Sequence, residues 1–223
     1  MNKKRNIFFI IIAFIVSTFF VIILTNYYVN KKQKELLNSI YESTHKNIFE
    51  KTQNLINDKQ NTSLAIAISL SKDETLYTHL KNKDFEKLNY VKIAKLIETN
   101  SKYKNIWIQI FDSNLNSVYR SWTNIRGSLN FRPDLKKIEA LKNISTSISA
   151  GLFNIGIKAR TPIFDENNNF YGALEVVTHF DSITEDLVKN NISPVVIGDK
   201  SIRKNLTNPL LSKLFIDDYY IAN

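Results

Sequence analysis

The chain has 223 residues, of which 43% are hydrophobic and 23% are charged, so its length allows one or two domains with a buried core. Its formal net charge of +9 comes from basic residues scattered along the sequence without a nucleic-acid recognition motif, which predicts a solvated basic surface and no nucleic-acid partner. The absence of cysteine excludes disulfide scaffolds, cysteine nucleophiles and thiolate metal sites.

The N-terminal segment predicts a transmembrane anchor. Residues 7–24 are apolar apart from Ser17 and Thr18, and a helix of this length spans about 27 Å, close to the thickness of the hydrocarbon core. A cleaved signal peptide is the alternative, but its apolar region is usually about 7–15 residues long and an A-x-A-like site would follow it. We therefore expect residues 1–29 to be a cytoplasmic tail and an uncleaved membrane helix.

Basic residues on both sides of this segment bear on its orientation. Three precede it and three follow it: Lys3, Lys4, Arg5, Lys31, Lys32 and Lys34. The positive-inside signal is therefore partly cancelled. Because a short basic N-terminal tail normally stays inside, we expect a single-pass protein of the inner (cytoplasmic) membrane, with the sensor domain in the periplasm or outside the cell.

A long stalk helix is predicted over residues 30–71. From residue 30 to residue 70 there is neither proline nor glycine, which indicates one helix or two collinear ones, about 60 Å long in total. Apolar residues recur at three- and four-residue steps and allow a parallel homodimer through this helix, although Lys51 and Asp58 interrupt the stripe. Residues 64–70 are apolar nearly all round, so we expect them to pack against a sheet.

Two shorter helices are predicted next, over residues 74–82 and 84–100. Ser71 or Asp73 can cap the first helix. The second has an apolar face made of Phe85, Leu88, Val91, Leu96 and Ile97.

The sheet is predicted to begin with a hairpin of residues 106–111 and 117–122. The first strand alternates between an aliphatic face and a face with larger or polar side chains: Ile106, Ile108 and Ile110 against Trp107, Gln109 and Phe111. Short polar residues between the two strands supply the turn. The face with the large aromatic residues either lines a ligand pocket or belongs to the core.

Three further strands complete a predicted five-stranded antiparallel sheet. They cover residues 146–152, 155–164 and 170–180, after a loop and a short helix at residues 135–142. The last strand has one apolar face and one mixed face, which carries Glu175 and His179. A long helix on the apolar face, with a loop or short helix over the mixed face, would enclose a small pocket.

The C-terminal part of the sequence predicts a helix over residues 181–190 and a strand at residues 195–199. The residues after it do not complete a domain. We therefore expect residues 72–190 to form one ligand-binding module and residues 191–223 to begin a second, incomplete one.

Four stretches of this chain match those of a known family: Trp107 to Phe111, Tyr119 to Trp122, the Arg132-Pro133 entry to the short helix, and Tyr171 to Thr178 leading to Asp181. With the order of the elements, they resemble the double Cache (PAS-like) extracytoplasmic sensor domain of bacterial chemoreceptors, histidine kinases and diguanylate cyclases. The resemblance covers about residues 30–200. It implies an α+β fold in which residues 72–190 are the membrane-distal Cache module.

The resemblance also implies positions for ligand contacts. In the amino-acid-binding branch of the family, an R-x-W-Y motif holds the ligand carboxylate and an aspartate after the last strand helps to hold the amine. Arg132 and Asp181 match these positions, whereas Asp134 and Leu135 stand where Trp and Tyr would be. The likeness is closer to a branch that carries R-S-W at the end of the second strand, here Arg120 to Trp122.

The predicted ligand-binding residues are Tyr119, Arg120, Trp122, Arg132, Arg160 and Asp181. The arginines could receive a carboxylate through paired N–H donors, and the aromatic rings could stack on a ligand. Surface ion pairing of the arginines, core packing of the aromatic residues and helix capping by Asp181 are the structural alternatives. The expected ligand is a small anionic or amino-acid-like metabolite.

These features predict the extracytoplasmic ligand-sensing region of a bacterial membrane receptor for signal transduction or chemotaxis, which transmits through the long helix to the membrane. The alternative is a membrane-anchored structural or pilin-like subunit, although residues 7–24 lack the processing site and glutamate of pilin signals. No catalytic motif occurs, and the three histidines lack metal-ligand spacing, so we predict no enzyme activity, no metal and no cofactor.

Overall fold

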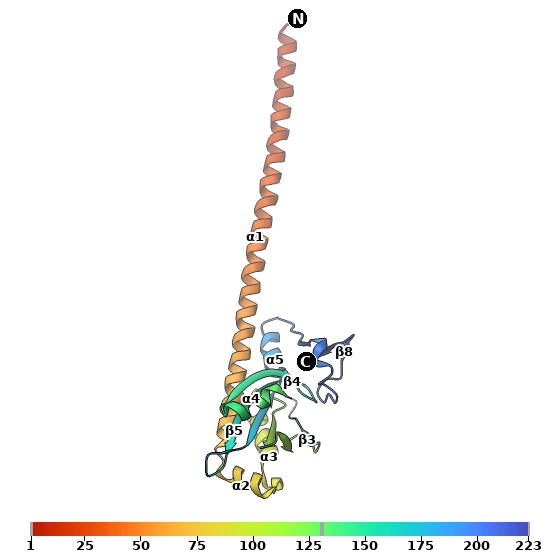
Figure 1. Ribbon diagram of the computed structural model, residues 1–223. Helices are drawn as coiled ribbons and strands as arrows, with labels where there is room; N and C mark the ends of the chain where they lie inside the picture. The colour runs from red at the N-terminus through yellow and green to blue at the C-terminus, as the bar shows by residue number, and fades with distance from the viewer. Residues whose placement is uncertain (1, 130–131, 223) are drawn as a thin grey trace. The chain divides into compact units, whose positions relative to one another are not determined.

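The computed structural model describes residues 2–129 and 132–222, and its first element is one unbroken helix, α1 (Asn2–Ser71; Figure 1). The two collinear helices that the sequence left open are therefore a single one. No glycine occurs before Gly127 and no proline before Pro133, so nothing in this part of the sequence breaks the helical hydrogen bonding. The chain divides into two compact units: the first ends at Lys51, and the second begins at Thr52.

The first unit is the N-terminal part of α1. Its side chains from residue 6 to residue 50 are exposed, including the large apolar ones of residues 7–24. This is the one helix of the described residues that is long and apolar enough to cross a membrane. A continuous apolar surface of this length is stable in a bilayer, whereas in water it would be costly.

The second unit contains the last part of α1 and, before residue 197, five shorter helices. They are α2 (Glu74–Asn82), η1 (Phe85–Lys87), α3 (Tyr90–Asn100), α4 (Pro133–Leu141) and α5 (Asp181–Val188). Asp73 caps α2 by accepting a hydrogen bond from the backbone N–H of Thr75 at 2.9 Å. The continuous helix expected over residues 84–100 is wrong, because Leu88 is extended (φ −72°, ψ 116°) and separates η1 from α3. Leu88 is buried, so tertiary packing overrides the helical pattern there.

The main sheet has six strands and is antiparallel throughout. They are β1 (Trp107–Asp112), β2 (Asn116–Arg120), β3 (Gly127–Ser128), β4 (Ser145–Ala150), β5 (Ile155–Phe164) and β6 (Phe170–Thr178), in the order β3-β2-β1-β6-β5-β4. The prediction of five strands missed β3. A strand of two residues is too short to carry an alternating pattern.

One face of this sheet packs against α1, α2 and α3. Its core contains alternate residues of the central strands with Ala67 of α1: Ile106, Ile108, Ile110, Leu174 and Val176. Ala67 is fully buried. The apolar faces predicted for the first and last strands, and the packing of the end of the long helix on them, are confirmed.

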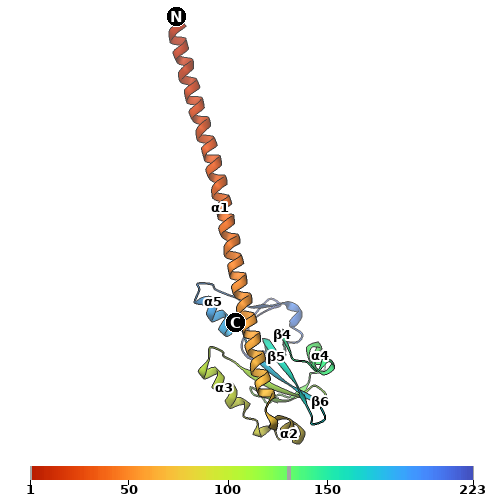
Figure 2. The ribbon, with the colours of Figure 1, turned by 90° about the vertical axis from the view of Figure 1, so that its left-hand side faces the viewer.

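The opposite face is covered by α4 at one end. Leu135 and Ile138 of α4 pack on Phe111 and Ala173, and Figure 2 shows α3 and α4 on opposite sides of the sheet. The neighbouring Gly172 allows β1 and β6 to approach, since a Cβ at this position would lie 2.2 Å from the carbonyl oxygen of Phe111. The rest of this face, toward the other ends of β1 and β6, is open to a cavity.

A second, three-stranded sheet follows α5. It contains β7 (Ile197–Gly198), β8 (Phe215–Ile216) and β9 (Tyr219–Ile221) in the order β7-β9-β8, with the short helix η2 (Lys200–Ile202) between β7 and β8. A hydrophobic cluster that includes Ile157, Leu187 and Tyr220 joins this sheet to β5 and α5. The division of the chain at residue 191 stays a prediction.

Candidate functional site

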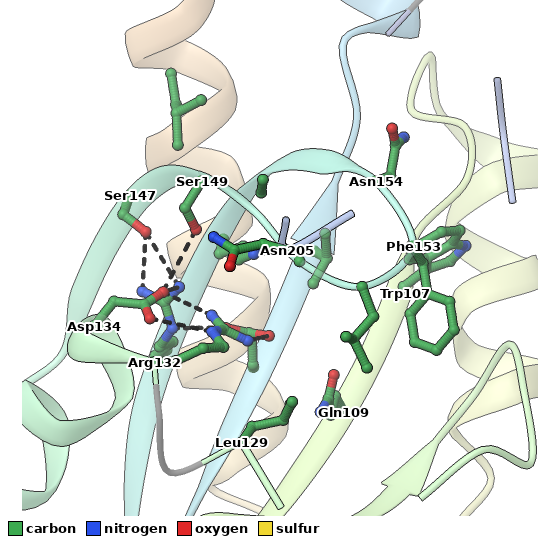
Figure 3. Close-up of a pocket in the computed structure, with 18 of the residues that line it drawn as sticks. Trp107, Gln109, Leu129, Arg132, Asp134, Ser147, Ser149, Phe153, Asn154 and Asn205 are labelled. Carbon is green, nitrogen blue, oxygen red and sulfur yellow. Dashed lines mark hydrogen bonds and ion pairs between the residues drawn. The ribbon is translucent and has the colours of Figure 1, made fainter. Parts of the chain in front are cut away.

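A cavity of about 760 Å³ lies over the sheet face opposite to α1. Its floor is formed by β1, β5 and β6, and its sides by β4, the start of α4, the β4–β5 turn and residues 202–205. Figure 3 shows the ion pairs around Asp134 on one side and the rings of Trp107 and Phe153 on the other. Cavities of this size hold small metabolites.

The register of the sheet arranges the polar residues of the floor in a row. Gln109 is paired with Arg120 on one side and with Glu175 on the other, and Glu175 is paired with Arg160. Because side chains alternate between the two faces, the residues two positions along form the next row of the same face. That second row contains Trp107, Val177 and Lys158.

Aromatic rings form one wall of the cavity. The indoles of Trp107 and Trp122 are stacked, with ring centroids 4.7 Å apart and planes 10° from parallel. The ring of Phe153 meets both of them edge-on, at 6.4 and 5.9 Å. This wall offers an apolar surface to the carbon skeleton of a ligand.

Four charged residues form a buried ion-pair network at the other side. Glu175 accepts from Arg132 (Nη1–Oε1 3.2 Å, Nη2–Oε2 2.8 Å) and from Nε of Arg160 (2.6 Å). Asp134 accepts from Nε and Nη2 of Arg132 at 3.1 and 2.6 Å, and also from Nη2 of Arg160. Both carboxylates are thus held by two guanidinium groups.

The network keeps both carboxylates ionised. Burial opposes the ionisation of Glu175, but Arg132 and Arg160 outweigh it and lower its pKa to about 2. The same two arginines hold the pKa of Asp134 well below its usual range, also against the effect of burial. Both negative charges are thus already paired with guanidinium groups, so neither carboxylate is available to pair with a ligand ammonium group.

Arg120 is the arginine of this face that lies outside the network. Its Nη1 donates to the backbone carbonyl of Ile125, whereas its Nε is buried without a hydrogen-bond partner. The guanidinium carbon lies 5.2 Å from the ring centroid of Phe153 and 5.9 Å from that of Trp122. Burial and the nearby Arg126 lower the pKa of Arg120 to about 10, so it is cationic at neutral pH.

Five buried donor atoms of the cavity lack a hydrogen-bond partner among the described residues. They are Gln109 Nε2, Arg120 Nε, Trp122 Nε1, Asn154 Nδ2 and Lys158 Nζ. Within residues 2–129 and 132–222, every buried side-chain oxygen of this cavity has a partner. Unpaired buried donors are costly, and acceptor atoms of a ligand would satisfy them.

The structure brings together four of the six predicted site residues. Arg120, Trp122, Arg132 and Arg160 line the cavity. Because side chains alternate between the two faces along β2, Tyr119 lies on the other face of the sheet. There its ring packs edge-on against that of Tyr90, with ring centroids 5.9 Å apart. It therefore does not line this cavity.

Asp181 also lies away from this cavity. It is the first residue of α5, and its Oδ2 accepts a hydrogen bond from Asn105 at 2.8 Å. The sequence interpretation placed Gln109 on the face that could line a pocket without naming it as a ligand contact, and it missed Asn154 and Lys158. Lys158 could have been found, because it stands two positions before Arg160 on the same strand and so shares its face.

The described residues contain no group of three or more His, Cys, Asp or Glu side chains that could hold a metal ion. The unpaired buried polar atoms of the cavity are all nitrogen donors, which suits hydrogen bonding to an anion.

Comparisons with known proteins relate this fold to solved structures. No family model matches the sequence, and no curated protein matches it. Among solved structures, the extracellular domain of vpHK1S-Z8, assigned as a histidine kinase, is 18% identical with a TM-score of 0.50 and covers 70% of this chain and 65% of that chain. The E. coli DcuS sensor domain is 19% identical with a TM-score of 0.48, over 60% of this chain and 98% of that chain.

The ligand-binding domain of the Campylobacter jejuni chemoreceptor Tlp3, in complex with L-valine, is 18% identical with a TM-score of 0.47, over 79% of this chain and 78% of that chain. The similar structures are thus Cache/PAS-like sensor domains of histidine kinases and chemoreceptors. The predicted resemblance to this family is confirmed at the level of the fold.

Proposed function

We propose that this chain is the sensing region of a bacterial membrane receptor and that its cavity binds a small organic anion. The observation that carries the proposal is the set of five buried donors without partners in a cavity whose carboxylates are already paired. A ligand carboxylate supplies two oxygen atoms with about four acceptor sites and would satisfy several of these donors together.

The charge of the lining also favours an anion. Six basic side chains face two carboxylates: Arg120, Arg132, Lys137, Lys158, Arg160 and Lys204 against Asp134 and Glu175. In a cavity with low-dielectric walls such an excess attracts negative charge. An amino acid would in addition need an acceptor for its ammonium group, and Asp181, which was expected to provide it, lies elsewhere. Within the predicted ligand class, organic anions are therefore favoured over amino acids.

A chain of contacts supports transmission from the cavity to α1. The ring of Trp107 meets that of His179 at 4.4 Å, and His179 Nδ1 donates to the backbone carbonyl of Asn105 at 2.6 Å. The side chain of Asn105 donates to Asp181 at the start of α5. The next residue, Ser182, accepts from Lys59 of α1 at 2.6 Å.

These contacts can transmit a signal only if the ligand binds one arrangement of the contacting residues more tightly than another. We therefore infer that ligand contact with the Trp107 and Trp122 wall biases the position of α5 against α1. The continuous helix then provides a route toward residues 7–24.

The proposal extends to the architecture expected from the sequence. Residues 1–29 would be the tail and anchor in the inner membrane, residues 30–71 the stalk, residues 72–190 the extracytoplasmic membrane-distal module and residues 191–223 the start of a second module. Leu37, Tyr41 and Ile48 of α1 are exposed within the first unit. Their spacing supports a homodimer through this helix.

Thermal unfolding of the full chain in detergent tests the ligand class. Two sets of related compounds, one aliphatic and one aromatic, are compared: propionate, alanine and propylamine, and benzoate, phenylglycine and benzylamine. We expect the anions to raise the melting temperature most, since ligand that binds the native state stabilises it, and the amines to leave it unchanged. A structural subunit without a ligand site would respond to none of the six.

Matched variants locate the binding. Arg120→Gln removes the cavity arginine that lies outside the ion-pair network and is expected to abolish the stabilisation by anions. Arg203→Gln removes a half-exposed arginine beside Asp218, in a segment whose neighbours Ile202 and Lys204 line the cavity, and should leave the stabilisation intact. Equal stabilisation by amines and anions, or a normal response of Arg120→Gln, would contradict the proposed site.

A further inference from the structure

Lys158 is a buried lysine that faces the cavity from β5. Its side chain is 3% exposed, and its Nζ has no hydrogen-bond partner among the described residues. The amine lies beneath the β4–β5 turn, since a Cβ added to Gly151 would lie 3.3 Å from Nζ. A lysine that is this buried normally pairs with a carboxylate.

The carboxylates near Lys158 are already engaged. Asp134 on α4 and Glu175 on β6 are each bound by two guanidinium groups, those of Arg132 and Arg160, so the four residues together are neutral. The other charged side chains that line the cavity are Arg120, Lys137 and Lys204, and the buried His179 is close enough for its charge to interact with that of Lys158. The neighbouring strand β4, in which Ser147 pairs with Lys158, carries no titratable side chain. The ammonium form of Lys158 would therefore be buried without a counter-ion.

Burial, followed by repulsion from Arg132, lowers the pKa of Lys158 from 10.5 to about 7. In the unliganded cavity the amine is thus mostly neutral at mildly alkaline pH. A carboxylate beside Nζ would supply the missing counter-ion and favour the ammonium form again.

We propose that an organic anion enters this cavity together with one proton, which Lys158 Nζ takes from the solvent. No bond other than N–H is made: the neutral amine, a proton and the carboxylate become an ammonium–carboxylate pair. The inference rests on the proposed function. Its consequence is a sensor whose occupancy depends on both anion concentration and pH.

The pH dependence follows from linkage. Where the free cavity holds neutral Lys158 and the occupied cavity holds the ammonium form, the binding constant falls about tenfold for each pH unit. We expect this slope between about pH 7.5 and pH 9, with a flat region below pH 7, where the ammonium form already dominates in the free cavity.

Titration calorimetry of the full chain in detergent at pH 8, with propionate and benzoate, measures the proton directly. The same titration is run in two buffers with different enthalpies of ionisation, and the difference gives the protons bound. We expect about one proton per anion for the wild type and for Lys92→Met, an exposed lysine on α3. Lys158→Met should bind anions without proton uptake and at least tenfold more weakly. Lys158→Arg, which carries a permanent charge, should also take up no proton.

The possible outcomes separate this inference from the proposed function. Anion binding without proton uptake in the wild type overturns the inference and leaves the function intact. Binding of neither anion overturns both. Lys59 is the rival proton acceptor, since burial lowers its pKa to about 8, although its Nζ already donates to Ser182. If Lys59→Met abolishes the uptake and Lys158→Met retains it, the assignment to Lys158 is wrong.

Discussion

Arg132 and Arg160 were expected to receive the ligand, and the structure instead pairs both with protein carboxylates. The sequence indicates the face of Arg160, because alternation along a strand is a local property, whereas Arg132 lies outside the strands, directly before α4. The sequence does not reveal their partners, because Asp134 reaches them only after α4 has packed on the sheet. The hydrogen bonds of an arginine, and not its presence, decide whether it is available to a ligand.

The network yields a stability prediction. Glu175→Gln leaves Arg132 and Arg160 buried with Asp134 as their remaining carboxylate, and the loss of one partner in a buried ion pair costs about 3–5 kcal/mol. Asp134→Asn should cost less, because the Asp134 side chain is 22% exposed and water can replace part of its role, whereas Glu175 is 1% exposed. Urea unfolding followed by tryptophan fluorescence measures both. An equal or larger loss for Asp134→Asn would contradict this ranking.

A second residue makes acid stability testable. Burial lowers the pKa of His179 from 6.5 to about 4. Between these two values the unfolded chain binds a proton that the folded chain does not, so stability present above pH 6.5 is lost as the pH falls toward 4. At 1.36 kcal/mol per pKa unit the loss is about 3 kcal/mol.

His179→Asn is the matched variant for this measurement. Its amide can still donate to the carbonyl of Asn105, as Nδ1 does in the wild type, but it does not titrate. We expect the unfolding free energy of the wild type, relative to that of His179→Asn, to decrease from pH 6.5 to pH 4. Any stability advantage of the wild type should therefore become smaller or change sign. A pH-independent difference would show that His179 is protonated equally in the folded and unfolded states.

At the scale of elements, long periodic segments could be predicted and short irregular ones could not. The two-residue β3 and the break between η1 and α3 depend on tertiary contacts, including the burial of Leu88. The aliphatic face of β1 and the apolar face of β6 followed from their alternation. The position of the pocket on the opposite face of the sheet could therefore be predicted. Which of its side chains lack hydrogen-bond partners could not.

The contact between α1 and α5 gives a prediction for the helix. If anion binding moves α5 against α1, a spin label at Asp58→Cys, an exposed position of α1 next to Lys59, should change its mobility on addition of benzoate. The chain has no native cysteine, so a single label is unambiguous. A label at Lys200→Cys, in η2, is the comparison position.

The same label tests the contact path. His179→Asn, Lys59→Met and the wild type are compared, and we expect Lys59→Met to reduce the response at position 58, because the hydrogen bond to Ser182 is lost. Reduced response with unchanged anion affinity supports transmission through this contact. An unchanged response in Lys59→Met would place the transmission elsewhere.

At the scale of the whole molecule, the sequence predicted an α+β chain with a long apolar N-terminal helix, and the structure has both. This success has a physical reason, since hydropathy and the absence of helix breakers act over tens of residues. The likeness to sensor domains was also predictable from the order of the elements. The ligand was not, because it depends on a few donor atoms that the fold leaves unpaired.

The central claim, that an organic anion binds through these donors, is tested most directly by the indole N–H resonances of the full chain. The chain has two tryptophans, and Trp122 Nε1 is one of the unpaired donors. In a ¹H–¹⁵N spectrum, assigned with Trp122→Phe, saturating benzoate should shift the Trp122 indole resonance downfield, as a new hydrogen bond to a carboxylate forms. Stabilisation of the protein by benzoate with both indole resonances unmoved would show that the anion binds outside this cavity.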